Sequence, residues 1–227
     1  MGAARVPDDV IQGFRALGDL TGTVSDVLDQ LGIVGAVPAA VLRPSDPKAR
    51  MVGRALTVLN RVRKESVAEA VATKKSGLGE IKAHSMARPG DVLVIQGVPN
   101  VSSLGGTSAT VGKRQGEIGA VVDGGVRDVD HSRSVGYPIW SSSVTPITGK
   151  WRVETAAVNQ PVVIAGVTVR PGDVVLADEC GVCFVPMERA SDVLAIAQRW
   201  SAWEEERLQK LASGMPLEEF TRLKRPE

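Results

Sequence analysis

Apolar residues recur with helical spacing near the start of the chain. One face of residues 8–17 is apolar, which predicts a helix; its members are Val10, Phe14 and Leu17. A second helix is predicted next, because Thr23 is a favourable N-cap residue and Gly32 a favourable stop. The apolar stripe of this second helix consists of Val24, Val27, Leu28 and Leu31.

Apolar runs of strand length alternate with helical patterns through the middle of the chain. The motif RPGD occurs at Arg88 and again at Arg170, and each copy is a Pro-Gly turn that starts an apolar strand. Residues 35–50 are rich in proline and alanine and are predicted to form a loop. Strands are predicted at 51–60, 91–96, 119–122, 138–142, 161–169, 173–177 and 182–185. Helical segments are predicted at 65–86, with a break near Gly77 and Gly79, at 106–116 and at 127–135.

This order of elements predicts a layered fold. The first half alternates strand and helix and the second half is mostly strand, which favours an α/β or mixed α+β domain with layered sheets. The 227 residues suit one domain with a helical appendage, a long helix predicted at 188–212. Trp200 and Trp203 lie on neighbouring faces of this helix. They either pack on the chain's own core or form an oligomer contact.

Composition excludes several classes of function. The 27 basic and 26 acidic residues give a formal net charge of +1, so there is no electrostatic attraction for nucleic acid or an anionic membrane. Aromatic residues make up only 4% of the chain, too few for a platform on which bases stack. No apolar run approaches the ~18 residues of a membrane span. We therefore expect neither a nucleic acid nor a membrane as partner.

The cysteines and the first residues indicate a compartment. Cys180 and Cys183 have CxxC spacing, but there is no second pair and no clustered histidine, so an apolar turn is favoured over a zinc or redox site. The start of the chain, MGAARVPDDV, lacks the apolar stretch of a secretion signal. We expect a cytoplasmic protein with reduced thiols.

The segment GAVVDGGVRDVDHSRSVGYP contains the first candidate for chemistry. Its pattern predicts a strand at 119–122, a turn at Gly124 and Gly125, and then a helix that begins near Arg127 and Asp128. In open α/β sheets, ligands bind at this carboxyl edge of the strands. An alternative is that Asp128 only stabilises the helix N-terminus through the helix dipole.

An upstream loop favours the first of these two interpretations, a ligand site. SSLGGTSAT, at 102–110, is a glycine turn that opens a helix, and its backbone N–H groups are able to hold a carboxylate or phosphate. About one helix and one strand separate Gly106 from Arg127, which places the two loops side by side. N–H donors with an arginine suit the carboxylate of a small oxo-acid. Asp128 suits a divalent cation such as Mg²⁺, which keeps several of its waters.

Over nearly its whole length, the sequence resembles the RraA-like family, which includes the 4-hydroxy-4-methyl-2-oxoglutarate aldolases. The resemblance is carried by TVSDVLDQLG, RPGDVLVIQG, GGTSAT, GAVVDGGVRD, GYPIW and PVVIAGVTVRPGDVVLADECGVCFVP. It implies a single-domain α/β fold, a layered sandwich of the swivelling β/β/α type, with a long C-terminal helix. It also implies a homotrimer or a hexamer of two trimers, with sites between subunits. The implied activity is a divalent-metal-dependent C–C lyase that releases pyruvate, often with oxaloacetate decarboxylation. Some relatives bind and inhibit RNase E.

The resemblance also implies roles for individual residues. Arg127 binds the keto-acid and stabilises the enolate, and Asp128 holds Mg²⁺ or Mn²⁺ directly or through water. The loop of Leu104, Gly105, Gly106 and Thr107 receives the substrate carboxylate through its amides. These roles fit the chemistry, because cleavage beside a ketone leaves an enolate that a cation and an arginine stabilise.

The sequence departs from the family pattern at its second carboxylate. Aldolases of the family have an acidic residue in place of Gly106, or a glycine there and an acidic residue three positions after the aspartate. The latter position is His131, and Asp130 comes one residue too early. His131 either ligates the metal, which favours Mn²⁺, Fe²⁺ or Zn²⁺ over Mg²⁺, or is a solvent-facing side chain without a role.

Three hypotheses about function follow. The first is a metal-dependent aldolase or decarboxylase that acts on a small 2-oxo acid such as 4-hydroxy-4-methyl-2-oxoglutarate or oxaloacetate. The second is a regulator that binds RNase E without catalysis, and the third is a relative that carries out another small-molecule reaction. The retained pair Arg127 and Asp128 and the near-neutral charge favour an enzyme.

Overall fold

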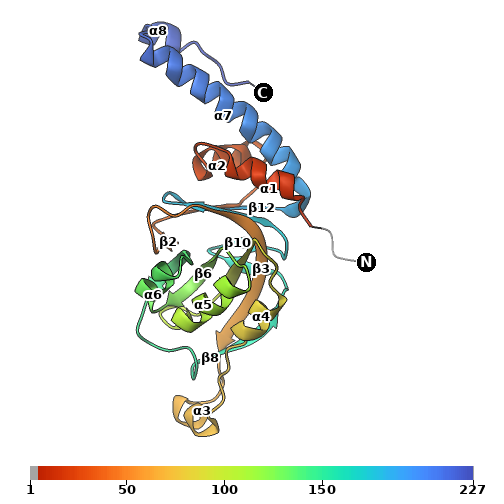
Figure 1. Cartoon of the computed structure of the whole chain (residues 1–227), viewed down its shortest axis with the longest axis vertical. Helices are drawn as coiled ribbons and strands as arrows, with labels where there is room; N and C mark the ends of the chain where they lie inside the picture. The colour runs from red at the N-terminus through yellow and green to blue at the C-terminus, as the bar shows by residue number, and fades with distance from the viewer. Residues whose placement is uncertain (1–4, 227) are drawn as a thin grey trace.

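One large mixed sheet organises the chain in the computed structural model, which describes residues 5–226 (Figure 1). Its main path runs β1-β12-β11-β3-β4-β6-β7-β2, with β5 paired to β6 and β8 paired to β3. The strands are β1 (Ala36–Pro38), β2 (Arg43–Pro44), β3 (Met51–Val62), β4 (Asp91–Gln96), β5 (Ser102–Leu104), β6 (Gly119–Val126), β7 (Ile139–Val144), β8 (Val153–Val158), β11 (Val174–Asp178) and β12 (Gly181–Val185). A separate hairpin is formed by β9 (Val162–Ile164) and β10 (Val167–Val169).

The centre of the sheet is parallel. β3, β4, β6 and β7 run in the same direction, as does β5 beside β6. The middle of β4, Val92 to Ile95, is fully buried, which explains why it reads as a continuous apolar run rather than an alternating pattern. The carboxyl ends of these strands therefore meet at one edge, and the loops that follow them lie together there.

Helices cover the sheet in two groups (Figure 1). The first group, α1 (Asp8–Arg15), α2 (Thr21–Gln30) and α7 (Ala190–Ala212), shares one apolar core with β3, β11 and β12. The second group, α4 (Glu80–Met86), α5 (Gly106–Arg114) and α6 (Val129–Ser134), lies by the parallel strands, where Ala83, Ala109 and Tyr137 belong to another core. The mixed α/β domain expected from the sequence is confirmed.

The apolar stripes of the two predicted N-terminal helices are confirmed, but one helix start is wrong. Val10, Phe14, Val24 and other stripe residues are buried in the core, and Gly32 ends the second helix with a left-handed φ of +66°. That helix begins at Thr21 rather than after Thr23. The amide and hydroxyl of Thr21 both donate to the carboxylate of Asp178, at 3.1 and 2.6 Å. A distant aspartate therefore takes the place of a local cap.

Three other local predictions are corrected. Residues 35–50 are not all loop, since they contain the short strands β1 and β2. The segment 161–169 is a hairpin, which turns at Ala165 and Gly166 where φ is positive. Gly124 and Gly125 do not form a turn but continue β6. A Cβ at Gly125 would lie only 2.7 Å from the Thr145 side chain and from the Val101 carbonyl. Those glycines are needed for close packing.

The C-terminal helix α7 projects from the body, and the small helix α8 (Leu217–Phe220) follows it (Figure 1). Trp200 is only 6% exposed and belongs to the chain's own core, which confirms that interpretation for this residue. The guanidinium of Arg225 lies over the Trp200 ring, 4.4 Å from its centroid, and pairs with Asp26. Trp203 stacks with Arg207. The segment after α8 thus returns along α7 and holds it.

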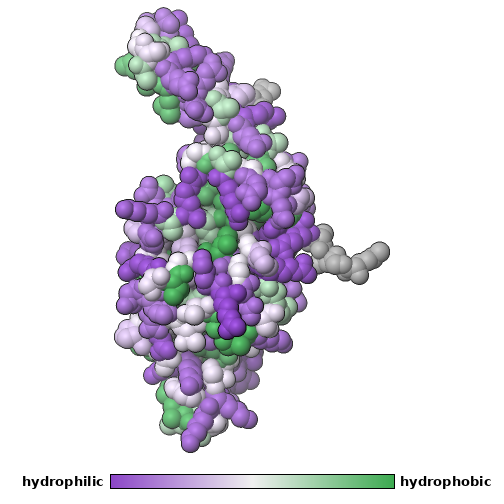
Figure 2. Space-filling model, viewed as in Figure 1, coloured by the Kyte–Doolittle hydropathy of each residue, from purple (hydrophilic) through white to green (hydrophobic). Residues whose placement is uncertain are grey.

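The viewed surface is mostly hydrophilic, with hydrophobic patches at both ends of the molecule (Figure 2). These ends are α8, where Leu217 is exposed, and α3 (Val67–Thr73), where Val67 and Val71 are exposed. Within residues 5–226, none of the helices has both the length and the apolar composition that a membrane crossing requires.

Candidate active site

The structure brings the two predicted loops together at the carboxyl edge of the parallel strands. β5 pairs with β6, Ser102 beside Gly125 and Leu104 beside Val126. The backbone N–H of Arg127 then donates to the carbonyl of Leu104, at 3.1 Å. Arg127 and Asp128 therefore leave the sheet directly beside Gly105 and Gly106. Leu104 itself is 2% exposed and belongs to the core.

Asp128 adopts a left-handed conformation, with φ 54° and ψ 42°. For a residue other than glycine this conformation is uncommon and costs free energy, and such residues occur often at functional sites. Here it turns the carboxylate toward α5, where Oδ2 accepts a hydrogen bond from the Gly106 N–H at 3.0 Å. The Nε atom of Arg127 lies 3.4 Å from the same oxygen. The side chains of Arg127 and Asp128 are 44% and 49% exposed, so both are accessible.

Gly105 and Gly106 allow this close approach. A Cβ at Gly105 would lie 2.9 Å from Asp128 Oδ2 and 3.1 Å from Arg127 Nε. A Cβ at Gly106 would lie 2.9 Å from the His131 ring and 3.3 Å from the Asp128 Cβ. Position 106 and position 131 are therefore direct neighbours in space. These are the two places where relatives are expected to carry the second carboxylate.

Two adjoining hollows flank Asp128, one on the side of Arg127 and one on the side of the 104–107 loop. One, of about 490 Å³, is lined by Arg127 and Thr145, and the other, of about 560 Å³, by Gly106 and Thr107. Asp128 and Asp130 line both hollows. Asp130, Thr110 and Thr145 were not expected at the site. Of these three residues, only Thr110 could have been predicted from the sequence, because it lies one helical turn after Gly106 and so on the same face of the helix.

His131 contacts α5 through a hydroxyl. The Nε2 atom of His131 lies 2.9 Å from the Thr110 hydroxyl, which also donates to the carbonyl of Gly106 at 3.0 Å. A hydroxyl has only one proton, which goes to the Gly106 carbonyl, so in this arrangement Nε2 donates to Thr110. The imidazole therefore bridges α6 and α5 beside Asp128.

The donor set fits a cation held by few protein ligands. Among residues 5–226, no group of three or more His, Cys, Asp or Glu side chains is arranged to hold a metal ion. The Gly106 amide donates to Asp128 Oδ2. Within the same residues, the other carboxylate oxygen, Oδ1, accepts no hydrogen bond and is available to a cation. A single accessible carboxylate beside a second acidic side chain, Asp130, suits a hard cation that keeps most of its waters.

A second polar cluster is buried beneath the same helix. The Nδ1 atom of His84 lies 2.8 Å from Glu117 Oε1, and its Nε2 atom lies 2.7 Å from the hydroxyl of Ser108. The Tyr137 hydroxyl donates to Glu117 Oε2 at 2.6 Å, and burial beside Glu117 raises the pKa of Tyr137. Because each donor meets an acceptor, His84 is a hydrogen-bonded core residue.

The two cysteines do not form a reactive pair. Cys180 is exposed and Cys183 is buried. Burial raises the pKa of the Cys183 thiol to about 12, and desolvation and nearby acidic groups also raise the pKa of Cys180. Both thiols are thus poor sources of the thiolate that metal binding or exchange requires.

Comparisons with known proteins place this chain in a family. Residues 21–184 match the RraA-like family, described as Aldolase/RraA. A Halalkalibacterium halodurans protein with the provisional name 4-hydroxy-4-methyl-2-oxoglutarate aldolase is 30% identical over 209 residues, which is 91% of this chain and 90% of that protein. Protein DlpA of Legionella pneumophila is 31% identical over 199 residues, which is 86% of this chain but only 31% of DlpA.

A solved structure agrees with the sequence matches. Streptomyces coelicolor RraAS2, described as an unusual member of the RNase ES inhibitor RraA protein family, superposes with a TM-score of 0.73. Its sequence is 27% identical, and the match covers 94% of this chain and 100% of that one. The fold, the extent of the family match and the aldolase name of a relative over nearly its full length agree, so this chain belongs to the RraA-like family.

Proposed function

We propose that this protein is a divalent-metal-dependent C–C lyase that cleaves a small 2-oxo acid such as 4-hydroxy-4-methyl-2-oxoglutarate and releases pyruvate. The observation that carries the proposal is the contact of Asp128 with the first amide of α5, with Arg127 beside both. The provisional aldolase name of the H. halodurans relative supports the reaction class.

The first turn of α5 is suited to bind the substrate carboxylate. Amides in the first turn of a helix have no partner within that helix, and the helix dipole favours an anion there. The Gly106 amide is taken by Asp128, which leaves those of Thr107 and Ser108. Thr107 is exposed at the hollow beside Asp128. We propose that these amides hold the carboxylate, with Gly105 leaving room for it.

Arg127 is suited to the charge that develops during cleavage. The C3–C4 bond of 4-hydroxy-4-methyl-2-oxoglutarate breaks, and its electron pair forms the enolate of one pyruvate. The C4 hydroxyl loses its proton and becomes the ketone of the second pyruvate, and a proton returned to C3 completes the balance. Loss of CO₂ from oxaloacetate leaves the same enolate. The guanidinium stabilises the enolate oxygen, as donors aimed at a developing charge do.

Asp128 would hold Mg²⁺ or Mn²⁺, directly or through water, with Asp130 as a water-mediated neighbour. When bound, such a cation supplies Lewis-acid stabilisation of the 2-oxo oxygen. His131 is a candidate ligand only through Nδ1, or through Nε2 after release from Thr110. Its present contact suggests a second role, which is to fix α6 against α5 so that the Asp128 carboxylate stays in place.

We also propose that the protein is a homotrimer or hexamer, in which a neighbouring subunit covers the open hollows beside Asp128. Light scattering at micromolar concentration tests this assembly, and a monomer would contradict it.

The activity is tested with protein freed of metal by a chelator. We expect pyruvate release from 4-hydroxy-4-methyl-2-oxoglutarate or oxaloacetate to require added Mg²⁺ or Mn²⁺. Absence of turnover on a panel of 2-oxo acids with either cation would overturn the lyase proposal. The description of RraAS2 as a member of an RNase ES inhibitor family supports a second candidate, a regulator that binds such a ribonuclease, which a pull-down on purified RNase E tests.

A further inference from the structure

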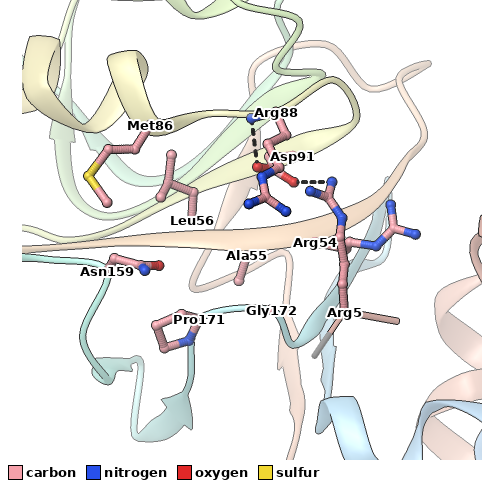
Figure 3. Close-up of a pocket in the computed structure, with 10 residues that line it drawn as sticks. All are labelled: Arg5, Arg54, Ala55, Leu56, Met86, Arg88, Asp91, Asn159, Pro171 and Gly172. Atoms are coloured by element: carbon pink, nitrogen blue, oxygen red, sulfur yellow. Dashed lines mark hydrogen bonds and ion pairs between the residues drawn. The ribbon is translucent and has the colours of Figure 1, made fainter. Parts of the chain in front are cut away.

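A second concave site lies at the end of the parallel strands opposite to Arg127. It has a volume of about 210 Å³ and lies near the point where β4 begins beside β3. Both RPGD turns contribute to it, the first through Arg88 and Asp91 and the second through Pro171 and Gly172 (Figure 3). The proposed lyase site makes no use of this recurring motif.

One positive charge in this pocket is left without compensation. The guanidinium of Arg5 pairs with Asp91 Oδ1 at 2.7 Å, and that of Arg54 pairs with Asp8. The second oxygen of Asp91 accepts the backbone N–H of Arg88 at 2.9 Å. Within residues 5–226, the guanidinium of Arg88 makes no hydrogen bond or ion pair. An anion entering the pocket would therefore meet a cation with all its donors available.

The pocket is polar at one end and largely apolar at the other. Figure 3 shows Arg88, Asp91 and Arg5 grouped together, with Leu56, Pro171 and Met86 extending away from them. The volume is below the ~300 Å³ at which sites for drug-sized ligands begin. These features suit a ligand of few atoms that has an anionic head and an apolar tail.

We infer that this pocket binds a small monocarboxylic acid, with the carboxylate on the Arg88 guanidinium and a short unbranched tail against Leu56, Pro171 and Met86. The planar guanidinium matches a carboxylate through two parallel hydrogen bonds. The apolar end favours a carboxylic acid over inorganic phosphate, which has no tail to bury. This binding is independent of the proposed lyase activity.

The second RPGD turn provides a matched control. Its Asp173 carboxylate accepts the Arg170 N–H at 2.7 Å, as Asp91 accepts that of Arg88, and its other oxygen accepts the Met187 N–H at 2.9 Å. The side chain of Arg170 is exposed and does not line the pocket. Arg88→Gln and Arg170→Gln thus remove the same group from equivalent turns, but only the first of these two arginines lines the pocket.

The test is a butyrate titration of the full chain, followed by amide NMR. We expect a dissociation constant on the order of 1 mM, with shifts centred on Gly90 and Gly172. Arg88→Gln should weaken butyrate binding about tenfold or more, and Arg170→Gln should change it less than about twofold. Uncharged n-butanol should bind much more weakly than butyrate.

Met86→Ala examines the apolar end of the pocket separately. Met86 is 44% exposed, so its truncation leaves the fold intact. It should weaken binding of butyrate but not of acetate, whose tail is too short to reach it. Equal effects of the two arginine variants, shifts centred on Gly105 and Gly106, or phosphate binding as tightly as butyrate would each overturn the proposal.

Discussion

The two histidines of the chain contact the same helix at different depths. His84 bonds the hydroxyl of Ser108 in the interior, and His131 bonds that of Thr110 at the surface. Residues two apart on a helix point to nearly opposite sides, so the spacing alone separates the two contacts. His84 is fully buried, whereas His131 is exposed beside Asp128.

The difference shows that a chain of hydrogen-bonded side chains does not by itself make a catalytic site. Ser108, His84 and Glu117 are joined in the order of a hydrolase triad. Ser108 is only 6% exposed, however, and Glu117 only 1%, so a substrate cannot reach the hydroxyl. Among the described residues, the outer cluster of Arg127, Asp128 and His131 forms no such chain of three side chains, but Arg127 and Asp128 are half-exposed beside two hollows. We therefore propose that the inner cluster stabilises the fold and that the outer cluster carries the chemistry.

The largest effect is expected at Arg127. Arg127→Ala should reduce kcat/KM for pyruvate release by about 10²–10³-fold, or ~2.7–4 kcal/mol, because it removes the donor to the enolate. Arg127→Lys should restore little, because an ammonium cannot form the planar fork. The urea midpoint of both variants should match the parent, and a comparable fall in stability would instead make Arg127 a structural residue.

Removal of the inner histidine should affect stability rather than chemistry. His84→Ala leaves the buried Glu117 without one of its two partners, so the free energy of unfolding should fall by about 3 kcal/mol. His131→Ala is the matched control and should change it by less than about 0.5 kcal/mol. Urea denaturation measures both. Equal losses in the two variants would remove the distinction between the clusters.

The outer histidine is expected to position rather than ligate. If His131 only positions, His131→Ala should raise the Mn²⁺ concentration for half-maximal activity by less than about threefold, because the contact it removes is with Thr110 and the carboxylate proposed to hold the cation remains. Titrations at two values of pH provide the check. An increase of tenfold or more that grows as the pH falls would show that His131 is a ligand, since protonation removes its lone pair.

The smallest effect, a change in the free energy of unfolding, is expected at Glu80, which lies at the edge of the inner cluster. Burial raises the pKa of Glu80, and its Oε2 is buried without a partner among the described residues. A raised pKa in the folded state means that ionisation destabilises the fold at neutral pH. Glu80→Gln should therefore stabilise the protein by up to about 1 kcal/mol at pH 7. The gain should shrink as the pH falls through the raised pKa, and a constant gain would contradict this explanation.

The sequence predicted those helices, strands and turns that are determined by residues close to one another in the chain. The two RPGD turns were found because Pro-Gly fixes the turn, and Gly90 and Gly172 do adopt positive φ. The edge that carries Arg127 and Asp128 followed from the order of strand and helix. β8 was missed because only Val153 of its six residues is buried, which leaves no apolar alternation.

Features that depend on distant residues were not predictable from the sequence. The start of α2 is set by Asp178, which is 157 positions from Thr21. His84 meets Glu117 across 33 positions. The contact of Thr110 with His131 and the left-handed backbone of Asp128 likewise arise only when α5 and α6 pack together. Nothing in the local pattern around any of these residues signals its partner.

The most direct test of the central claim is the rate of pyruvate release by Asp128→Asn with saturating Mn²⁺. Asparagine tolerates the left-handed backbone and retains an oxygen for the Gly106 amide, so the fold should be unchanged. The substitution removes only the negative charge that is proposed to hold the cation. We predict a loss of activity of at least about 10²-fold with a parental urea midpoint. Activity within a few-fold of the parent would show that Asp128 does not carry the chemistry.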